Sequence, residues 1–340
     1  MKVRVYAKSD NSKTNLIKFY SLTVRKSIDE ICQSAEIHCP LSEFKKVQKH
    51  DKIFIKAVMD WNNEERAFCY ILVDSIASTL NNNEKSMTII GRSYARDLVD
   101  SVDTGMINGG TLVQLVQRVA SKYNSSIKVE HYPTGQDPSP NIEFFDWENE
   151  SVWQRLLNTA ENNGYSIASN NIGNLYVWKK ETYLANNANH KFIENENIIS
   201  ASLNMNASEQ FNKYCVKGNY EDVEKIDSTC KTKRVFTINF SDEYISSQEL
   251  KIRAESELKR RKSPELNIEL KGWGLSDEII TKKKIENKNK IEVFFEPKHK
   301  VPVIIPSLNI DDVMIIKDAT YTLNKDEFSS SLNLVDRSAL

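Results

Sequence analysis

Residues 87–102 read MTIIGRSYARDLVDSV and mark a change in the pattern of the chain. Up to Gly91 the residues are mostly apolar or β-branched, as in a buried strand. From Arg92 onward charged residues are frequent, and acidic residues recur where the strand ends. The stretch therefore separates a β-rich beginning, residues 1–97, from a region of mixed helices and strands, residues 98–195.

The β-rich beginning contains short segments rich in Val, Ile, Phe and Tyr, separated by polar residues. Alternation of polar and apolar residues over 51–78 is typical of strands with one buried face. Only SIDEICQSAEI (27–37) has apolar residues at a helical spacing. Evenly spaced strands without regular intervening helices predict an antiparallel barrel or sandwich. The strand-like segments are VRVYA (3–7), KFYSLTV (18–24), KIFIKAVM (52–59), AFCYILVDSIA (67–77) and KSMTIIG (85–91).

Two amphipathic helices are predicted after residue 97. Thr111 and Ser151 are each followed three residues later by Gln, which is a capping-box pattern, and apolar residues with a helical period follow both. Gly164 stands where the second helix should end. Two β-type segments on either side of NNIGN (170–174) then predict a hairpin. We expect a small α+β domain over residues 98–195.

The second half of the chain returns to strands. A third capping box, Ser246 to Glu249, opens a charged helix that ends at Ser263 and Pro264. We assign this helix, residues 241–264, to a position on the α+β domain. The strand-like segments on either side of it, residues 196–240 and 265–340, are assigned to one second β-barrel.

Composition excludes several functional classes. The chain has 340 residues with 46 basic and 47 acidic side chains, so its net charge of −1 gives no general attraction to nucleic acid or anionic lipid. Only ten residues are glycine, and neither GxGxxG nor GxxxxGK[ST] occurs, which argues against common nucleotide sites. No apolar run approaches the ~20 residues of a membrane helix, and the start lacks a signal sequence.

No constellation of residues points to catalysis or to a metal. The five cysteines lack CxxC spacing and are expected to be reduced thiols, and the five histidines are isolated. Asp97, Asp100 and Asp103 could share a metal-binding face, but solvated or capping acids are the favoured interpretation. A glycosidase needs two carboxylates across a cleft, and 47 acids make such a pair easy to imagine and uninformative. We expect no enzyme activity, no cofactor and no metal.

Charged and aromatic clusters also have ordinary explanations. The basic run 251–262 contains interleaved Glu255 and Glu257, which favours a solvated helix face over a phosphate site. TKKKIENKNK (281–290) is expected to be an exposed hairpin tip. A sugar-binding surface would need exposed tryptophans, whereas a structural protein would bury them. The tryptophans are Trp61, Trp147, Trp153, Trp178 and Trp273.

The segment 87–102 resembles the strand-plus-GR-x-x-x-RDLVD signature of baseplate hub proteins of contractile phage tails. This is the Mu-like tail protein, late control D and VgrG N-terminal hub superfamily. Further blocks that resemble the family follow in the family's order and extend the likeness over nearly the whole chain. They are TLVQLVQRVASKY (111–123), the helix and hairpin of 144–179, the strand pair of 198–219, AESELKRRKSPELNIELKGWG (254–274), and the terminal hairpin of 314–340. The usual pattern is lost at 284–300, so the strands of 281–310 have no assigned register.

The resemblance implies a β-rich α+β fold with two tube-type antiparallel β-barrel domains and an inserted α+β domain. It implies a virion structural protein that forms a homotrimeric, pseudo-sixfold ring in a phage, prophage or other contractile injection system. The implied partners are the tail tube protein, a central spike protein and other baseplate (wedge) proteins, with DNA passing only transiently through the lumen. The implied location is the tail baseplate, after assembly in the host bacterial cytoplasm.

The family-motif residues are expected to be structural. Gly91 should allow a tight exit from its strand, Asp97 should cap the following turn, and Trp273 should fill a domain junction. The full set is Gly91, Arg92, Arg96, Asp97, Leu98, Trp153, Gly164, Gly218, Gly272 and Trp273.

Two other functions remain open at this point: a carbohydrate- or receptor-binding tail module, and a tail-associated cell-wall hydrolase. Within the hub class, VgrG-like spikes are near neighbours, and because the chain ends at Leu340 we expect any spike to be a separate protein. The near-neutral charge predicts an acidic or mixed lumen rather than a basic one. The sequence names neither the host nor the partners, and it does not identify the interface residues.

Overall fold

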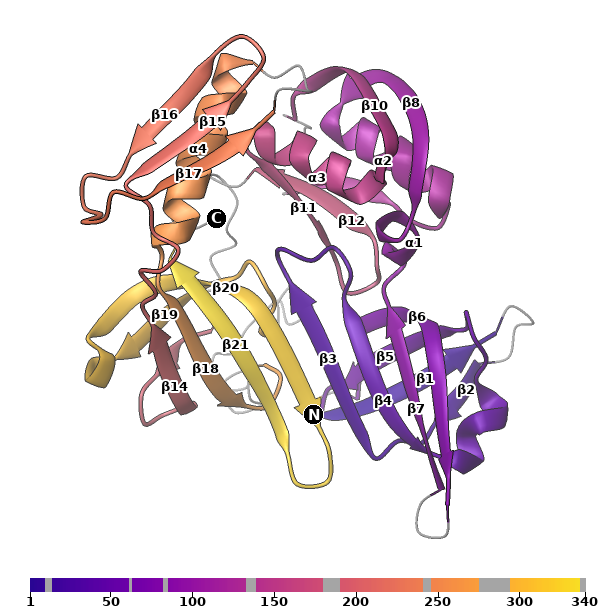
Figure 1. The fold of residues 1–340 in the computed structure, drawn as a ribbon. Coiled ribbons are helices and arrows are strands. Elements are labelled where there is room, and N and C mark those ends of the chain that lie inside the picture. The colour runs from indigo at the N-terminus through magenta and orange to yellow at the C-terminus, as the bar shows by residue number, and fades with distance from the viewer. Residues whose placement is uncertain are drawn as a thin grey trace.

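The computed structural model describes residues 1–9, 14–60, 63–81, 85–132, 139–179, 190–240, 246–274 and 294–336. These residues build four parts, which we call the first lobe (1–92), the central unit (96–179), the second lobe (190–204 and 265–336) and the α4 module (213–262). The two β lobes lie side by side, and the central unit and the α4 module lie together above them (Figure 1).

The part of the first lobe that the structure describes consists of seven strands and one short 3-10 helix. Strands β3 and β4 alternate between buried and accessible residues, because one side of each of these strands faces the apolar interior. The elements are β1 (Lys2–Lys8), β2 (Thr14–Ile17), β3 (Ser21–Ser27), β4 (Ser34–Pro40), η1 (Leu41–Lys46), β5 (Lys52–Val58), β6 (Glu65–Leu80) and β7 (Lys85–Arg92).

The stretch 27–37, whose apolar residues have a spacing that could be helical, contains no helix. Ser27 ends β3, and β4 begins at Ser34. The apolar residues in this stretch are buried by different neighbours, since Ile28 packs near Trp178 and Ile31 joins the core of the central unit. The helical spacing therefore results from burial against different neighbours along an irregular connection between β3 and β4.

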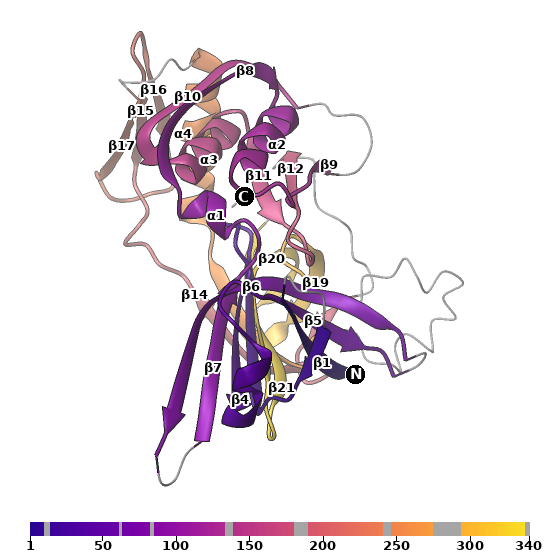
Figure 2. The same ribbon diagram turned by 90° about the vertical axis from the view of Figure 1, so that its right-hand side faces the viewer.

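The central unit contains both expected amphipathic helices and the hairpin. Thr111 caps α2 with the full capping box, Ser151 accepts a hydrogen bond from the backbone N–H of Gln154 in α3, and β11 pairs with β12. A two-stranded ribbon of β8 and β10 wraps over the two helices (Figure 2). The elements are α1 (Arg96–Val99), β8 (Val102–Thr111), α2 (Leu112–Tyr123), β9 (Val129–Tyr132), β10 (Asn141–Ser151), α3 (Val152–Asn162), β11 (Tyr165–Ser169) and β12 (Leu175–Lys179).

The boundary between the second lobe and the α4 module differs from the one that was assigned from the sequence. Residues 213–239 were expected in the second barrel, but they form a separate three-stranded sheet on which α4 packs. The helix covers its own sheet with Leu250 and Ala254, and it contacts the central unit at α3 and at Asn163 just after α3, whose side chain donates a hydrogen bond to Glu249 at 3.1 Å. The module's elements are β15 (Lys213–Lys217), β16 (Asp222–Ile226), β17 (Val235–Asn239) and α4 (Ser247–Lys262).

In its described residues, the second lobe is built from six strands and a short 3-10 helix. The chain enters it at β13 and β14, leaves for the α4 module, and returns through β18. Its elements are β13 (Phe192–Ile193), β14 (Ile198–Asn204), β18 (Glu265–Lys271), β19 (Lys300–Ile305), η3 (Pro306–Leu308), β20 (Ile310–Leu323) and β21 (Phe328–Asp336).

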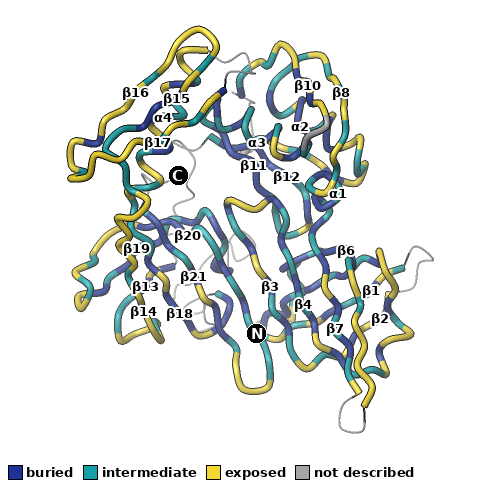
Figure 3. Tube along the Cα trace, in the orientation of Figure 1, coloured by how far each residue is buried: buried dark blue, intermediate teal, exposed yellow. Residues whose placement is uncertain are grey.

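Both lobes belong to one thirteen-stranded sheet. The strand order is β14-β18-β21-β20-β3-β4-β7-β6-β5-β1-β2, with β19 and β13 attached to the first half of β20. The lobes are joined where Asp318–Leu323 of β20 pairs with Leu22–Ser27 of β3 in antiparallel register. The interior residues of both lobes form one continuous apolar cluster, and buried segments run through the middle of the sheet while exposed residues lie at its ends (Figure 3). Among the described residues, none of the helices combines the length and the apolar character needed to cross a bilayer.

Candidate functional site

The contact between the two lobes, which we call the seam, has an aromatic centre at Trp273. Trp273 is fully buried and stacks on Phe68 of the first lobe at 4.5 Å between ring centroids. Its other ring neighbours are Tyr321 and Phe328 of the second lobe, and its indole N–H donates to the carbonyl of Thr322 at 3.1 Å. Trp273 therefore contacts rings of both lobes where the lobes meet.

The Lys26 side chain, next to the aromatic rings around Trp273, forms hydrogen bonds with three parts of the molecule. Its ammonium donates to the carbonyl oxygen of Phe68 at 2.7 Å, to Oδ1 of Asn171 at 2.8 Å and to Glu296 at 2.8 Å. These partners come from the first lobe, the β11–β12 turn of the central unit and the second lobe. An ammonium has three N–H donors, and all three are used. The ammonium also lies 4.0 Å from the centroid of the Phe68 ring, a cation–π contact.

Lys26 was missed in the sequence analysis although a signal was present. Leu22, Val24 and Lys26 share one side of β3, and the first two are fully buried. A lysine on the buried side of an alternating strand indicates a buried charge that requires partners. The partners themselves lie far along the chain, so only the charge and not the site could be predicted.

The GR-x-x-x-RDLVD segment forms a second junction, between the first lobe and the central unit. Arg92 pairs with Asp74 at 2.8 Å and with Asp100 at 2.6 Å, and Arg96 pairs with Asp74 at 2.6 Å. Arg96 also donates to the carbonyl of Val73 at 3.1 Å. The register of β6 against β7 shifts between Val73 and Ser75, so Asp74 is the extra residue of a β-bulge. The bulge brings the Asp74 carboxylate within reach of both arginines.

Gly91 and Asp97 have roles that differ from those expected. Gly91 lies inside β7, where a Cβ would stand 2.3 Å from the carbonyl oxygen of Leu72. Glycine is required by this close approach of two strands rather than by an exit turn. The Asp97 carboxylate accepts a hydrogen bond from Asn124 at 3.0 Å, after the end of α2, and α1 has no side-chain cap. The Asp97 side chain therefore links α1 to the C-terminal end of α2 and does not cap a turn.

The remaining motif residues are spread over three parts of the molecule. Leu98 and Trp153 are buried in the core of the central unit, and Gly164 follows α3 with φ of 75°, in the left-handed region that favours glycine. Gly218 lies in the turn between β15 and β16, and Gly272 ends β18 with φ of 82°. Arg92 and Arg96 share Asp74 as a partner, whereas Trp273 lies at the seam and Gly218 lies in the α4 module. The motif residues therefore do not form one site.

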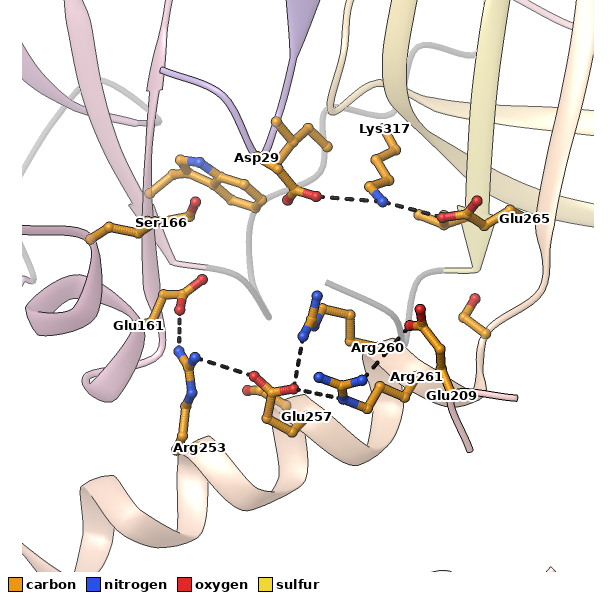
Figure 4. A pocket seen from close by; sticks show the side chains of 16 residues that line it. Asp29, Glu161, Ser166, Glu209, Arg253, Glu257, Arg260, Arg261, Glu265 and Lys317 are labelled. Atoms are coloured by element: carbon orange, nitrogen blue, oxygen red, sulfur yellow. Dashed lines mark hydrogen bonds and ion pairs between the residues drawn. The ribbon is translucent and has the colours of Figure 1, made fainter. Parts of the chain in front are cut away.

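A charged cavity of about 360 Å³ lies where the α4 module meets the rest of the molecule (Figure 4). Glu257 of α4 pairs there with Arg253 at 3.2 Å, Arg260 at 2.9 Å and Arg261 at 3.2 Å. Burial alone would raise the pKa of Glu257, but the hydrogen bond from Arg260 and the nearby arginine charges reverse the shift and lower it. Arg253 also pairs with Glu161 of α3.

On the facing wall of this cavity, Lys317 of β20 lies between Asp29 at 3.4 Å and Glu265 at 3.2 Å. Positive and negative groups therefore line the cavity together, and they already pair with one another. The arrangement is a network of ion pairs between domains rather than a site of one charge sign that would attract a ligand.

The other residues considered for chemistry lie in different places. Asp97, Asp100 and Asp103 diverge, since Asp100 binds Arg92 and Asp103 binds Lys122 at 2.6 Å. No group of three or more His, Cys, Asp or Glu side chains suited to a metal occurs in the described parts of the chain. All five cysteines are free, and burial raises the pKa of Cys39 and Cys69 to about 12, so these thiols stay protonated at neutral pH.

The exposure of the tryptophan side chains distinguishes a structural protein, which buries them, from a sugar-binding protein, which exposes them. Trp147, Trp153, Trp178 and Trp273 are at most 8 % exposed, so none of these four offers a ring for stacking on a saccharide. Trp61 and the expected hairpin tip at 281–290 lie outside the described residues.

Comparison with known proteins gives one relative by sequence and several by fold. No family model matches the chain. The chain is 23% identical over 231 residues to baseplate hub protein gp44 of Escherichia phage Mu, a match that covers 62% of this chain. The matched part is 59% of the length of gp44, less than two thirds of that protein.

Among solved structures, the tail protein of Neisseria meningitidis MC58 has a TM-score of 0.77 at 16% identity, covering 100% of this chain and 99% of the other. The 43 kDa tail protein of prophage MuSo2 from Shewanella oneidensis has a TM-score of 0.75 at 17% identity, with the same coverage of both chains. A type VI secretion component of E. coli, described as similar to phage T4 tail proteins, has a TM-score of 0.59 at 8% identity and covers 98% of this chain and 76% of its own.

These likenesses agree with the order of the sequence blocks and with the β-rich architecture of two sheet lobes around a small α+β unit. The chain shares the fold of phage and prophage tail proteins and is similar in sequence to a baseplate hub protein, which confirms the resemblance predicted from its sequence.

Proposed function

We propose that this chain is the structural baseplate hub of a contractile phage tail or a related particle. Three copies would form a pseudo-sixfold ring that joins the tail tube to the central spike. The observation that carries the proposal is the joining of two β lobes in one chain by the pairing of β20 with β3. Two lobes in each of three copies give six lobes, the number that a sixfold tube presents.

The rigidity of the seam supports this role. The lobes share hydrogen-bonded strands and one apolar interior, so their relative orientation is fixed within the chain. A ring of six similar lobes around an axis needs such a fixed angle, because an error in the angle would prevent closure. In this proposal Trp273 and Lys26 hold the angle.

The partners in this proposal are further copies of the chain, the tail tube protein, the central spike protein and the wedge proteins of the baseplate. DNA passes the hub only transiently, and the chain carries out no catalysis. The chain belongs to the tail baseplate of the virion and is assembled in the cytoplasm of the host bacterium. The buried tryptophans and the internally paired charges give no support to a glycan-binding module or a hydrolase.

The test is the mass of the purified chain in solution, measured by light scattering. One chain has a mass of 39.1 kDa, so the hub proposal predicts three times that value, about 117 kDa. A particle that stays at 39.1 kDa, both alone and after a tail tube or spike protein is added, would contradict the ring.

A further inference from the structure

The first lobe carries a basic and aromatic surface on β2, β1, β5 and β6, the four strands at the end of the large sheet that lies away from the seam (Figure 1). Alternate residues of these strands point outward, and register partners form rows across the strands. Two rows are basic, with Lys8 beside Lys52 in one and Arg4 beside Lys56 in the other. The row between them is apolar and at least partly exposed, and it consists of Leu16, Tyr6, Phe54 and Tyr70. We call these three rows the basic-aromatic face.

The two basic rows place like charges directly opposite each other. Lys8 is the register partner of Lys52, and Arg4 is the partner of Lys56. Such pairs on neighbouring strands lower the stability of a sheet. Glu65 relieves the second pair, because its carboxylate binds Arg4 at 2.7 Å and Lys56 at 3.2 Å. In the described part of the chain, no acidic side chain pairs with Lys8 or Lys52. The sheet therefore keeps a positive charge here that its own folding does not need.

The excess of positive charge is local to this surface. Lys2 also points outward from β1, so the outward side of the four strands carries five basic side chains and one acid, Glu65. Charged groups at the β5–β6 end of the surface are internally paired, since the N-terminal ammonium binds Asp60 and Arg66 binds Glu64 at 3.4 Å. The whole chain has a net charge of −1. An excess of four positive charges on one side of one lobe therefore indicates an acidic partner.

The α4 module shows a different arrangement of surface charges. There Lys213 pairs with Glu224 at 2.6 Å, and Lys225 pairs with Glu255 at 2.6 Å. Acids thus alternate with bases and neutralise them within the molecule. The basic-aromatic face has only Glu65 for this purpose, so a partner from outside must supply the remaining carboxylates.

The apolar row indicates which kind of acidic partner fits. Leu16 is 53% exposed, and the rings of Phe54 and Tyr70 meet edge to face, with centroids 4.7 Å apart and an interplanar angle of 82°. Rings at this angle do not offer parallel faces on which successive nucleotide bases could stack. The hydroxyl of Tyr6 donates to Glu65 at 2.7 Å, and this carboxylate would repel a phosphate that crosses the row. A protein segment can instead bury apolar side chains on the row and place carboxylates over the basic rows.

We propose that the basic-aromatic face is a docking surface for an acidic segment of another protein, in which Asp and Glu residues flank aromatic or aliphatic side chains. The apolar side chains of this segment pack on the row from Leu16 to Tyr70. Its carboxylates pair with Lys8 and Lys52, the two cations that have no acidic partner within the described chain. The proposal goes beyond the ring described under Proposed function and does not depend on it, because the face lies within one lobe.

The experiment uses a fluorescein-labelled random copolymer of glutamate and tyrosine as the probe. Its binding to the full-length chain is followed by fluorescence anisotropy at low salt, and polyglutamate, oligothymidylate and phosphatidylserine vesicles are the comparison ligands. The variant Lys8→Glu/Lys52→Glu reverses the unpaired charges of the face. The matched control, Lys217→Glu/Lys251→Glu, makes the same change in net charge at two exposed lysines of the α4 module.

We expect the wild-type chain to bind the copolymer at least ~10-fold more tightly than polyglutamate or oligothymidylate, because only the copolymer contacts both the apolar row and the basic rows. The K8E/K52E variant should lose at least ~10-fold in affinity for the copolymer, and the control should stay within ~2-fold of the wild type. Leu16→Ser should reduce the preference for the copolymer over polyglutamate, because it removes an exposed part of the apolar row.

The stability of the single variant Lys8→Glu is a second readout. This change places an acid opposite Lys52, so it should raise the midpoint of urea denaturation while it weakens binding of the copolymer. A merely structural role of Lys8 would not give a variant that is more stable and binds less. A lower midpoint would contradict the claim that the lysine pair is kept at a cost to folding.

Equal loss of affinity in the K8E/K52E variant and in its control would reduce the binding to general charge attraction and overturn the proposal. Tighter binding of oligothymidylate or of the vesicles than of the copolymer would assign the face to nucleic acid or to a membrane, and would also overturn it. The same conclusion follows if the wild-type chain does not bind the copolymer. These results are independent of the mass of the assembly, so failure of the docking surface and failure of the ring are distinguished.

Discussion

The seam between the lobes and the contact between α4 and α3 join domains in opposite ways. The seam is made of paired strands and fully buried rings, with Trp273 at its centre. The α4 contact is made of ion pairs around a cavity, with Arg253 bonded to Glu161 and Glu257 held by three arginines. The seam is apolar and closely packed, whereas the α4 contact is charged and surrounds a cavity.

This difference indicates which angle in the molecule is fixed and which can adjust. Apolar burial is insensitive to moderate salt and does not titrate, whereas partly exposed ion pairs weaken as salt rises. The two lobes should therefore keep one orientation in all conditions. The α4 module, which is attached through two chain crossings, can change its contact with α3 at small cost.

The largest expected effect is the loss of the seam's central ring. Trp273→Ala removes contacts with Phe68 and Tyr321 and leaves a cavity, so it should lower the free energy of unfolding by about 3–5 kcal/mol. It should also reduce soluble yield and trimer assembly. Urea denaturation measures the change, and Trp273→Phe serves as the milder control. A loss below about 1 kcal/mol would mean that the seam does not depend on this ring.

A loss of similar size is expected at Lys26. Lys26→Met leaves Glu296 half-buried without its cation and should destabilise the protein by about 3 kcal/mol. In the double variant Lys26→Met/Glu296→Gln, the uncompensated charge is gone and part of the stability should return. If the double variant is as unstable as the sum of the two single variants in urea denaturation, the two groups are not coupled.

Gly91→Val tests the close approach of β6 and β7. The first side-chain carbon would stand 2.3 Å from the carbonyl oxygen of Leu72, so the strands must separate, at a cost of about 2 kcal/mol. Because β7 is a central strand, soluble expression and trimer yield should both fall. Ile90→Val on the outward side of the same strand is the control and should behave like the wild type. Unchanged trimer yield for Gly91→Val would contradict this account of the glycine.

A smaller effect, and one that depends on salt, is expected at the α4 contact. Arg253→Gln removes the pairs with Glu161 and Glu257 and should cost about 1 kcal/mol at low salt. The difference from the wild type should shrink at high salt, while that of Trp273→Ala should not. Equal salt dependence of the two variants in urea denaturation would remove the distinction between the two contacts.

The smallest effect is on pH dependence. The pKa of Glu257 is lowered from its ordinary value of 4.5 in the folded protein, so its contribution to stability is present above pH 4.5 and is lost as the pH falls further through the folded pKa. Hydrogen exchange should therefore show α4 amides losing protection below pH 4.5 before the amides of β20 do. Simultaneous loss in both elements would indicate that the α4 contact is not the acid-sensitive one.

The sequence predicted those elements whose stabilising contacts are local. The capping boxes at Thr111 and Ser246 and the glycine after α3 were correct, because a cap is determined by residues within one helical turn. The alternation in β5 was also correct, since the pleat fixes which side of a strand is buried.

The parts that the sequence did not predict depend on contacts between distant segments. The pairing of β20 with β3 joins residues almost 300 positions apart and leaves no local pattern. The stretch 27–37 has a helix-like spacing because its three isoleucines are buried in three different apolar clusters. The strands of the α4 module were assigned to the second barrel because they have the same composition as the strands of the lobes, and only the pairing of the strands separates the two sets.

The most direct test of the account is a cryo-EM reconstruction of the assembled hub. The account predicts three copies with six lobes around a central channel, and the two lobes of each chain at the angle set by the pairing of β20 with β3. A reconstruction without six lobes around one axis, or with the lobes of one chain at a different angle from that set by the seam, would contradict it.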